Sequence, residues 1–445
     1  MIFPFSEASP VRFPGPQPAA CDVVVVGGGV IGVMTAWFLA ERGLRVVVCE
    51  KGRIAGEQSS RNWGWIRQQG RDPGELPIMM ESLRIWKSLA QELGAGLGFA
   101  QTGVLYLANS EKDTKGFEEW LPHAKTHDLD SRMRSRAEVA GMLGTAAGWQ
   151  GALYTASDAR AEPSVAVPML AAGAAARGAT IVEACAVRAL DIMGGRVAGV
   201  VTEQGRIACD QVVVAGGAWS RLFLGKHGVR IPQLSVLSTV AATDPMAEVF
   251  PGAAADNDFA FRRRADGGYT IAPGSGHDFF VGRDACASLR SYLPVLKKDY
   301  RSTRFRGMAP NGFPDAWSTP RQWSADEVTP FERMRVLNPA PDHARLRRVQ
   351  AAFGAAFPAL GVPKLRAAWA GMIDTMPDIV PVVDQAGVPG LTIATGMSGH
   401  GFGIGPGIGR VVADLVVGNH PGHDLSRFRL SRFSDGSKLV MGTAL

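Results

Sequence analysis

Cysteine is scarce in this sequence, which has 5 cysteines among its 445 residues. Their number is odd, they are widely spaced, and most of them lie within strand-like runs. The five are Cys21, Cys49, Cys185, Cys209 and Cys286. This pattern predicts neither a disulfide framework nor a zinc site, and it is typical of a protein of the reducing cytoplasm. We therefore expect a cytoplasmic protein without a metal site.

The N-terminal region lacks the features of a targeting segment. Residues 1–20 contain five prolines but neither a basic start nor an apolar run, so we expect neither a signal peptide nor a membrane anchor. Residues 23–40 are nearly free of charge and are about as long as a membrane-spanning helix. Three consecutive glycines at 27–29 and a charged pair at 41–42 argue against that alternative, so we expect no integral membrane span.

The sequence also lacks repeats, low-complexity tracts and a strong charge imbalance, because its net charge is +6 at pH 7. Short basic clusters lie at 262–264, 297–298 and 345–348 without a nucleic-acid motif, and we interpret them as solvated surface. We expect no nucleic-acid partner, although one arginine of 262–264 is a candidate for facing an anionic substrate. The hydrophobic content of 46% and charged content of 20% indicate a globular protein. Its length predicts two domains.

The most informative positive feature is the segment 22–50. An apolar strand leads into a Gly-x-Gly-x-x-Gly motif formed by Gly27, Gly29 and Gly32, and an expected helix at 30–42 follows. In such a motif the first glycine permits a tight turn, the second lets the backbone approach a pyrophosphate, and the third lets the helix pack on the strand. The helix N-terminus then points its unpaired amides at the phosphates.

A second strand ends in Glu50, which lies 18 residues after Gly32. A carboxylate at this place can accept hydrogen bonds from both hydroxyls of an adenosine ribose. Its charge would repel the 2′-phosphate of NADP, so the motif predicts a NAD-like ligand or FAD. A NAD-dependent dehydrogenase is one alternative, and such a protein would purify colourless.

Two more segments suggest a ligand site and an interleaved chain. The loop at 56–69 is polar and rich in turn residues, yet it carries Trp63 and Trp65, a composition typical of a loop that contacts a ligand. A buried strand at 211–214 stops at Gly216 and Gly217, which suggests that the chain returns there to the dinucleotide-binding sheet.

A glycine-rich segment lies near the C-terminus. Residues 399–409 have glycine at every second position, after a strand and before an expected apolar helix at 411–417. Glycines at this density let a flat ring lie against bare backbone, and a helix N-terminus can stabilise negative charge on that ring. A flexible linker is the alternative, but the regular flanking elements argue against it.

Hydrophobic periodicity and turn residues predict further elements. A Ser-Ala-Asp-Glu sequence at 324–327 predicts a capping box. Expected helices cover 77–93, 137–143, 163–177 and 342–357, and expected strands cover 103–107, 180–183, 195–202, 207–210, 269–272 and 279–282.

Together these regions resemble the FAD-dependent D-amino-acid oxidase, glycine oxidase and sarcosine oxidase family. That family has the dinucleotide motif and its acid near the N-terminus, a strand followed by an Ala-Gly-Ala-Trp-Ser-like segment in mid-chain, and a Gly-His-Gly-Phe loop beside the flavin. Residues 214–219 match the mid-chain segment except at Gly217, and residues 399–402 match the loop. Residues 369–372 and 377–378 resemble the Trp-x-Gly segment and the Pro-Asp turn of the family.

The resemblance implies an α/β fold, in which a Rossmann-like FAD-binding domain is interleaved with an α+β substrate domain built on a large mixed sheet. We assign residues 1–95, 151–230 and 365–445 to the FAD-binding domain, and residues 96–150 and 231–364 to the substrate-binding domain. The expected FAD contacts are Gly27, Gly29, Val30, Ile31, Gly32, Glu50, Lys51, Ser59, Ser60, Arg61, Asn62, Trp63, Val187, Ala215, Gly216, Trp219, Gly371, Gly399, His400, Gly401, Phe402, Gly403 and Ile404.

The sequence departs from the family at positions that bear on the substrate. Ile373 stands where many of the amino-acid oxidases carry a carboxylate-binding arginine. In the sarcosine oxidase branch an arginine at the end of a Ser-Arg-x-x-x-Ile-Arg-like loop has this role, and Arg67 fits it by spacing. That branch also has a lysine where this chain has Gly403. The segment 369–378 has no cysteine and the loop 56–67 has no histidine, so we expect noncovalent FAD.

The resemblance implies oxidation of the C–N bond of an amino acid, by hydride transfer to flavin N5 and hydrolysis of the imine by water. Arg67 and His400 are the candidate catalytic residues. Trp65, His277 and Ile373 join Arg67 as candidate substrate contacts. Backbone amides of the glycine-rich segment are expected to stabilise the reduced flavin.

A secondary amine is the preferred substrate, for example an N-substituted glycine, an imino-diacid or an opine-like compound. This preference depends on the sarcosine-oxidase-like Arg67 and on the absence of the amino-acid-oxidase arginine. Oxidation of a 2-hydroxy acid is an alternative, and so is a flavin subunit of a multi-subunit dehydrogenase. The electron acceptor, oxygen or another, and the assembly, a homo-oligomer or a complex, stay open.

Overall fold

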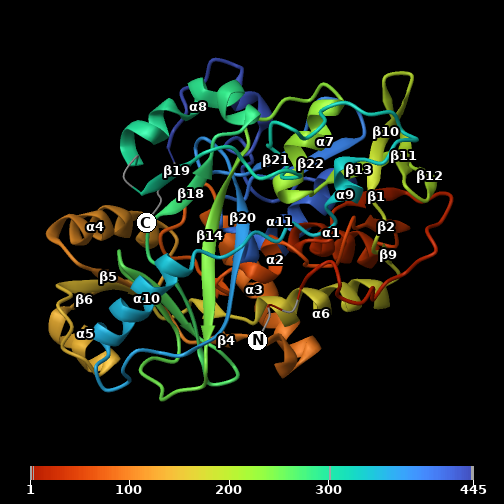
Figure 1. Cartoon of the computed structure of the whole chain (residues 1–445). Helices are drawn as coiled ribbons and strands as arrows, with labels where there is room; N and C mark the ends of the chain where they lie inside the picture. The colour runs from red at the N-terminus through yellow and green to blue at the C-terminus, as the bar shows by residue number, and fades with distance from the viewer. Residues whose placement is uncertain (1–2, 4, 300–301, 442–445) are drawn as a thin grey trace.

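The computed structural model describes Phe3, residues 5–299 and residues 302–441. The fold contains two large β-sheets, one in each half of the molecule. The long strands β14 and β20 lie between the two halves in Figure 1. β14 (Leu234–Thr243) and β20 (Leu365–Thr375) form an antiparallel ladder, which pairs Leu234 with Thr375 at one end and Thr243 with Leu365 at the other.

The first sheet has six strands in the order β21-β22-β13-β1-β2-β9. The pairs are parallel except for β21 and β22. The strands are short apolar runs, as expected for a parallel sheet that is covered on both faces. They are β1 (Val23–Val26), β2 (Val46–Cys49), β9 (Thr180–Val182), β13 (Gln211–Val214), β21 (Val382–Gln385) and β22 (Leu391–Thr395).

Alternate residues of β1 point into two different cores. Val23 and Val25 pack against helices, whereas Val24 packs against a three-stranded antiparallel sheet on the other face. The helices are α1 (Val30–Glu41), α3 (Leu76–Leu93), α6 (Pro163–Ala176) and α11 (Gly401–Val416). The covering sheet consists of β10 (Val187–Met193), β11 (Arg196–Thr202) and β12 (Gly205–Ala208), and α7 (Ser220–Lys226) lies beside it.

The second sheet has ten strands in the order β19-β18-β14-β17-β16-β15-β5-β7-β6, with β20 paired to β14. Helices α5 (Arg136–Leu143) and α10 (His343–Ala356) cover one face, and α4 (Glu111–Thr126) covers the other. The remaining helix here is α8 (Arg283–Asp299). The other strands are β5 (Val104–Ala108), β6 (Ser131–Ser135), β7 (Gly151–Thr155), β15 (Ala253–Ala255), β16 (Phe259–Arg263), β17 (Tyr269–Pro273), β18 (His277–Phe280) and β19 (Thr303–Arg306).

Short elements connect the two halves. β3 (Trp65–Ile66), β8 (Ala159–Arg160) and β4 (Ala100–Gln101) form a small antiparallel sheet. The one-turn helix α2 (Gln58–Arg61) precedes β3 and contacts β20 through Arg61, whose Nη1 donates to the carbonyl oxygen of Ala370 at 3.0 Å.

The predicted fold class, an α/β protein with a large mixed sheet, is confirmed, and most predicted elements are present within a few residues. Two expectations are wrong. The helix expected at 411–417 begins at Gly401, because the glycines let it pack closely between α1 and α3. The sequence at 324–327 forms a turn, in which Ser324 N donates to Glu327 Oε2 at 2.8 Å, and no helix follows it directly. The next helix, α9 (Pro330–Arg333), has Thr329 as its own N-cap.

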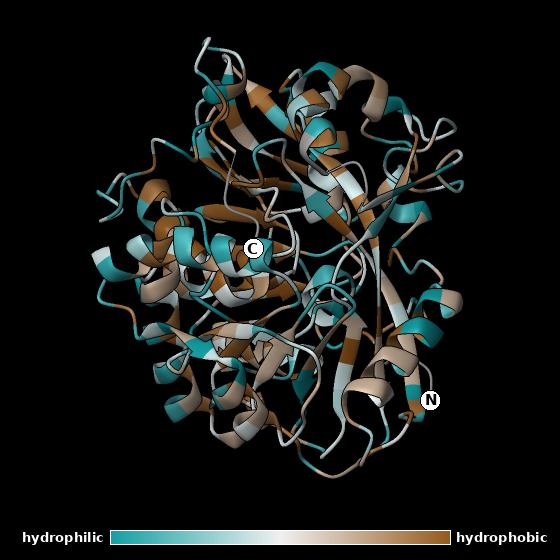
Figure 2. Cartoon of the chain, turned by 90° about the vertical axis from the view of Figure 1, so that its left-hand side faces the viewer, coloured by the Kyte–Doolittle hydropathy of each residue, from teal (hydrophilic) through white to brown (hydrophobic). Residues whose placement is uncertain are grey.

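The uncharged stretch 23–40 consists of β1, a turn and α1. Within residues 5–299 and 302–441, no helix has both the length and the apolar character needed to cross a membrane. Figure 2 shows that hydrophobic segments gather on the inner strands, while the outer helices carry hydrophilic faces. All five cysteines are unpaired thiols.

Candidate cofactor and substrate site

A cavity of about 1010 Å³ opens at the carboxyl ends of β1, β2 and β13 and extends to the ten-stranded sheet. Ligands of open parallel sheets bind at this end of the strands. Nearly all of the predicted site residues line this one cavity. The exceptions are Gly32, Ser60 and Ile404, which are not among its lining residues.

The first turn of the nucleotide motif is built for close backbone contacts. Gly27 has a φ of +110°, which an L side chain rarely adopts. A β-carbon on Gly32 would lie 2.0 Å from the carbonyl oxygen of Gly27, so only glycine lets α1 pack there. Gly29 is the N-cap of α1, and the amide of Val30 donates to Ser59 Oγ at 2.9 Å. This helix N-terminus faces the cavity and suits a pyrophosphate.

Glu50 stands at the end of β2, where the motif requires an acid. Its carboxylate accepts hydrogen bonds from the amides of Gly28 and Gly52, each at 2.7 Å. Burial raises the pKa of this carboxyl to about 7, against the opposing effect of Lys51 and the two amides. The residues here therefore fit the ribose of an adenine dinucleotide.

A second carboxylate, Glu57, forms an ion pair and hydrogen bonds with neighbouring residues of the cavity. Lys51 Nζ lies 2.6 Å from Glu57 Oε1 and 4.4 Å from the ring centroid of Trp219. The indole Nε1 of Trp219 donates to Glu57 at 3.1 Å, and the amide of Leu337 donates to it at 2.9 Å. This network fixes the side chains that flank Glu50.

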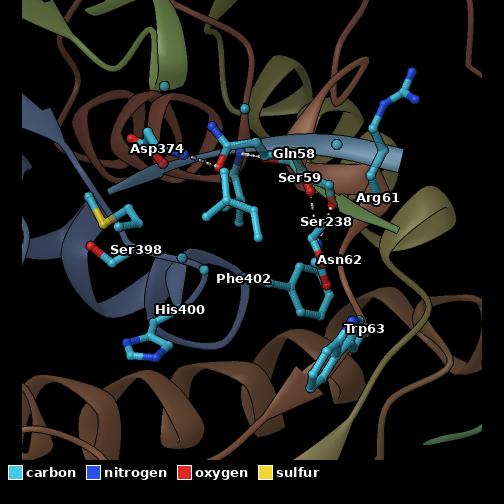
Figure 3. Close-up of a pocket in the computed structure, with 18 of the residues that line it drawn as sticks. Gln58, Ser59, Arg61, Asn62, Trp63, Ser238, Asp374, Ser398, His400 and Phe402 are labelled. Carbon is cyan, nitrogen blue, oxygen red and sulfur yellow. Dashed lines mark hydrogen bonds between the residues drawn. The ribbon is translucent and has the colours of Figure 1, made fainter. Parts of the chain in front are cut away.

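The α2 segment and the N-terminus of α11 face each other across the cavity. In Figure 3, Gln58, Ser59 and Asn62 lie on one side, and His400 and Phe402 lie on the other. The side chain of Arg61 points away from this space in Figure 3. Its guanidinium donates to the carbonyl oxygens of Gly56 and Ala370, so it joins α2 to β20.

His400 is the N-cap of α11 and lies beside a buried ion pair. Arg71 donates to Glu75 Oε2 at 3.0 Å and to the carbonyl oxygen of His400 at 3.0 Å, while His400 Nδ1 is 3.8 Å from Glu75 Oε2. Burial, helped by Arg71 and Arg67, lowers the pKa of His400 to about 4. The imidazole is therefore neutral at pH 7, and the unpaired amides of the α11 N-terminus are left to stabilise negative charge.

Arg67 follows β3 and is 9% exposed. Its Nη1 donates to the carbonyl oxygen of Gln69, and its guanidinium carbon lies 5.5 Å from the ring centroid of Tyr106. Among the described residues, no carboxylate is within ion-pair distance of Arg67, and Nε and Nη2 donate to no protein atom. This leaves the edge of the guanidinium that can bind a carboxylate through two parallel hydrogen bonds.

Asp158 holds the segment that follows Arg67. It is fully buried, and its Oδ1 accepts from the amide of Gln68 at 2.7 Å while its Oδ2 accepts from the amide of Gln69 at 3.3 Å. Burial raises the pKa of Asp158 to about 7. Sequence reasoning did not identify Asp158, since a single acid between two strands has no distinguishing pattern.

The structure also brings residues to the cavity that the sequence did not single out. Tyr106 belongs to a predicted apolar strand, and Phe117 belongs to α4, a mainly polar helix for which we predicted no element. Asp374, next to Ile373, accepts from the amide of Gly396 at 2.7 Å. His277, by contrast, was predicted as a substrate contact, and it lines the cavity at the start of β18 together with Ser275 of the preceding turn.

Comparisons with known proteins agree with this geometry. The model of the FAD dependent oxidoreductase family, DAO, matches residues 22–415. The chain is 26% identical to sarcosine oxidase subunit beta of Rhizobium meliloti over 436 residues, which covers 96% of this chain and 91% of that protein. It is 26% identical to glycine oxidase of Geobacillus kaustophilus over 442 residues, with coverages of 92% and 97%.

Among solved structures, L-amino acid deaminase from Proteus myxofaciens in complex with anthranilate superposes with a TM-score of 0.90 at 30% identity. The match covers 95% of this chain and 97% of that chain. The family model describes FAD dependent oxidoreductases, and the named relatives and the solved structure are oxidases or a deaminase of amino acids. The chain therefore belongs to the FAD-dependent oxidoreductase family, DAO, and is a flavoenzyme of its amino-acid- and amine-oxidising group.

Proposed function

We propose that this enzyme oxidises the C–N bond of an amino acid whose carboxylate binds Arg67, and that the substrate is a secondary amine. N-substituted glycines, imino-diacids and opine-like compounds belong to this class. The observation that carries the proposal is the unpaired edge of Arg67 in the same cavity as the α11 N-terminus. A buried guanidinium without a carboxylate partner favours binding of an anion.

The chain's own residues orient the substrate and control charge. Arg67 fixes the carboxylate, so the Cα–H bond is held in one orientation. FAD held by the nucleotide motif and Glu50 would supply the acceptor for a hydride, which leaves Cα with the electron pair of this bond. The nitrogen lone pair then forms the C=N bond, and water hydrolyses the imine to a carbonyl compound and an amine. Amides at the α11 N-terminus would donate hydrogen bonds to negative charge on the reduced flavin, while His400 stays neutral.

A primary amino acid is the second candidate, because the similar structure with a TM-score of 0.90 is an L-amino acid deaminase. The two candidates differ in their products. A primary substrate releases ammonia, whereas a secondary substrate releases a primary amine.

The test is anaerobic bleaching of the flavin with matched primary, secondary and tertiary amino acids and with 2-hydroxy acids, followed by analysis of the released nitrogen compound. We expect the highest rate with a secondary amine. Faster bleaching by a primary amino acid, with ammonia as product, would move the assignment to the second candidate. Bleaching by hydroxy acids alone would contradict C–N oxidation. Turnover with a dye but not with oxygen would support a subunit that passes electrons onward.

The role of Arg67 is tested by Arg67→Met. Loss of one partner of a buried charge pair is expected to lower kcat/KM by roughly thirtyfold to several thousandfold, which corresponds to about 2–5 kcal/mol. FAD content should not change. Arg67→Lys should restore only part of the activity, because an ammonium cannot form the two parallel hydrogen bonds.

Arg132→Met is the matched control, since Arg132 is an exposed arginine of β6 and its loss removes the same charge. Near-normal kinetics of Arg67→Met would assign the carboxylate to another residue. Loss of flavin from that variant would instead make Arg67 a cofactor-binding residue.

A further inference from the structure

Four aromatic side chains form a row along one wall of the cavity. They are Trp63, Trp65, Tyr106 and Phe117, and all four line the cavity. The ring centroids of successive members lie 5.3, 6.2 and 6.2 Å apart. The row brings together the segment before β3, β3 itself, β5 and α4, which are distant in the sequence.

This row borders the proposed carboxylate site. Trp65, in β3, and Arg67, which directly follows β3, both line the cavity. Ile66, between them, points into the core with α1, α3 and α11. Because the Arg67 guanidinium lies 5.5 Å from the Tyr106 ring centroid, a small molecule bound at Arg67 can also contact the aromatic rings.

The wall has the composition of a binding surface for a large apolar group. Tyr106 and Phe117 are each 7% exposed, and the phenol oxygen of Tyr106 donates no hydrogen bond to a described residue. Both rings therefore pack mostly against protein, and a substrate as small as N-methylglycine would leave their cavity-facing part in contact with water. A larger apolar group would cover them and gain the free energy of removing apolar surface from water.

We propose that Trp65, Tyr106 and Phe117 form a subsite for a large apolar group of the substrate, aromatic by preference. The subsite narrows the proposed function, on which it rests, since Arg67 is taken as the partner of the carboxylate. Substrates that place only a hydrogen atom or a methyl group in this subsite should have a low kcat/KM. Trp63 ends the row on the cofactor side, next to Asn62.

A binding experiment tests the subsite without turnover. The holoenzyme is titrated with phenylacetate and with acetate, and the change in the flavin absorbance spectrum gives the two Kd values. We expect phenylacetate to bind at least about tenfold more tightly, the lower end of the discrimination that apolar pockets achieve. Equal Kd values would overturn the subsite.

Variants separate the aromatic wall from the carboxylate site. Phe117→Ala should remove most of the preference for phenylacetate and leave acetate binding unchanged, whereas Arg67→Met should weaken both acids. Tyr106→Phe keeps the ring and should keep the preference. Phe305→Ala removes an aromatic ring that is 51% exposed on β19 and serves as the control. If Phe117→Ala lost its flavin, Phe117→Leu would provide the same comparison.

Turnover measurements then show whether the subsite takes the substituent on nitrogen or the one on Cα. They also distinguish failure of the subsite from failure of the proposed function. N-benzylglycine and N-methylphenylalanine carry the ring on nitrogen and on Cα, and one of them should exceed N-methylglycine in kcat/KM by at least about tenfold. A higher kcat/KM for N-methylglycine would overturn the subsite but not C–N oxidation. Preferential binding of phenylacetate without oxidation of any amine would contradict the proposed function and leave the subsite standing.

Discussion

At the scale of single residues, Glu50 shows how burial at a motif position shifts the pKa of a carboxyl group. The fold places its carboxylate between two backbone amides, and burial nevertheless raises its pKa to about 7. The protonated form is thus well populated near neutral pH in the protein without ligand. Ribose hydroxyls donate hydrogen bonds, so they favour the ionised form.

This titration predicts that FAD binds the apoprotein more tightly as pH rises. With a pKa of about 7, the ionised fraction of Glu50 increases from about a tenth at pH 6 to about nine tenths at pH 8, so the Kd of FAD should fall by roughly tenfold. Glu50→Gln should weaken binding by about 1.5–3 kcal/mol and remove this pH dependence. Fluorescence titration of apoprotein at several pH values measures both effects. Unchanged affinity in the variant would exclude Glu50 from the site.

The same scale shows which site residues a sequence can reveal. Gly27, Gly29 and Glu50 were predictable because their spacing encodes a local turn, a helix N-terminus and a strand end. Tyr106 was not, because an aromatic residue on an apolar strand has the same pattern whether it fills a core or lines a cavity. Phe117 was not, because it belongs to α4, a mainly polar helix for which we predicted no element. The long-range pairing of segments that makes them cavity residues is absent from local sequence.

At the scale of elements, α11 is where the local pattern was most misleading. Each glycine weakens an isolated helix by about 1 kcal/mol relative to alanine, so the segment 399–409 read as a loop. In the structure, α11 packs closely between helices α1 and α3. A β-carbon on Gly405 would lie 2.7 Å from Val30 Cγ2 on α1, and one on Gly407 would lie 2.6 Å from the carbonyl oxygen of Ile78 on α3. Tertiary packing thus overrides helix propensity.

The close packing of α11 predicts that Gly→Ala substitutions at two helical glycines change stability in opposite directions. Gly409→Ala would place a β-carbon 2.5 Å from Met34 Cβ and 2.7 Å from its backbone carbon, and we expect a loss of about 1–3 kcal/mol of stability. Gly141→Ala in α5 has no atom within 4 Å of the new carbon, so it should gain about 0.5–1 kcal/mol. Thermal unfolding of both variants measures the difference. A stabilised Gly409→Ala would contradict the close packing.

At the scale of the whole molecule, the cavity joins two sheets that the chain visits alternately. Strands of the six-stranded sheet come from residues 23–49, 180–214 and 382–395. Strands of the ten-stranded sheet come from the residues between them, at 104–155, 234–306 and 365–375. Periodicity predicted most strands of the six-stranded sheet but only β5, β17 and β18 of the ten-stranded one. It did not predict the ladder between β14 and β20, which pairs residues more than a hundred positions apart. That ladder carries Gly371 and Ile373 to the cavity.

Because one cavity takes its walls from both sheets, bound FAD should stabilise both halves together. We also expect the FAD to be noncovalent and therefore releasable. The cysteine and histidine residues that line the cavity are Cys49, His277 and His400. Cys49 ends β2 next to Glu50, where the ribose is expected, and His277 begins β18 in the ten-stranded sheet. We expect neither residue to bond the flavin ring. Acid precipitation should therefore leave the yellow flavin in the supernatant.

Flavin retained in the acid pellet would show a covalent link and would point to His400. With noncovalent FAD at a hundred times its Kd, the free energy of unfolding should rise by about 2.7 kcal/mol. Tryptophan fluorescence and circular dichroism should then report one transition that moves to higher temperature as FAD is added. Two transitions, only one of them sensitive to FAD, would mean that the halves unfold independently despite the shared ladder of β14 and β20.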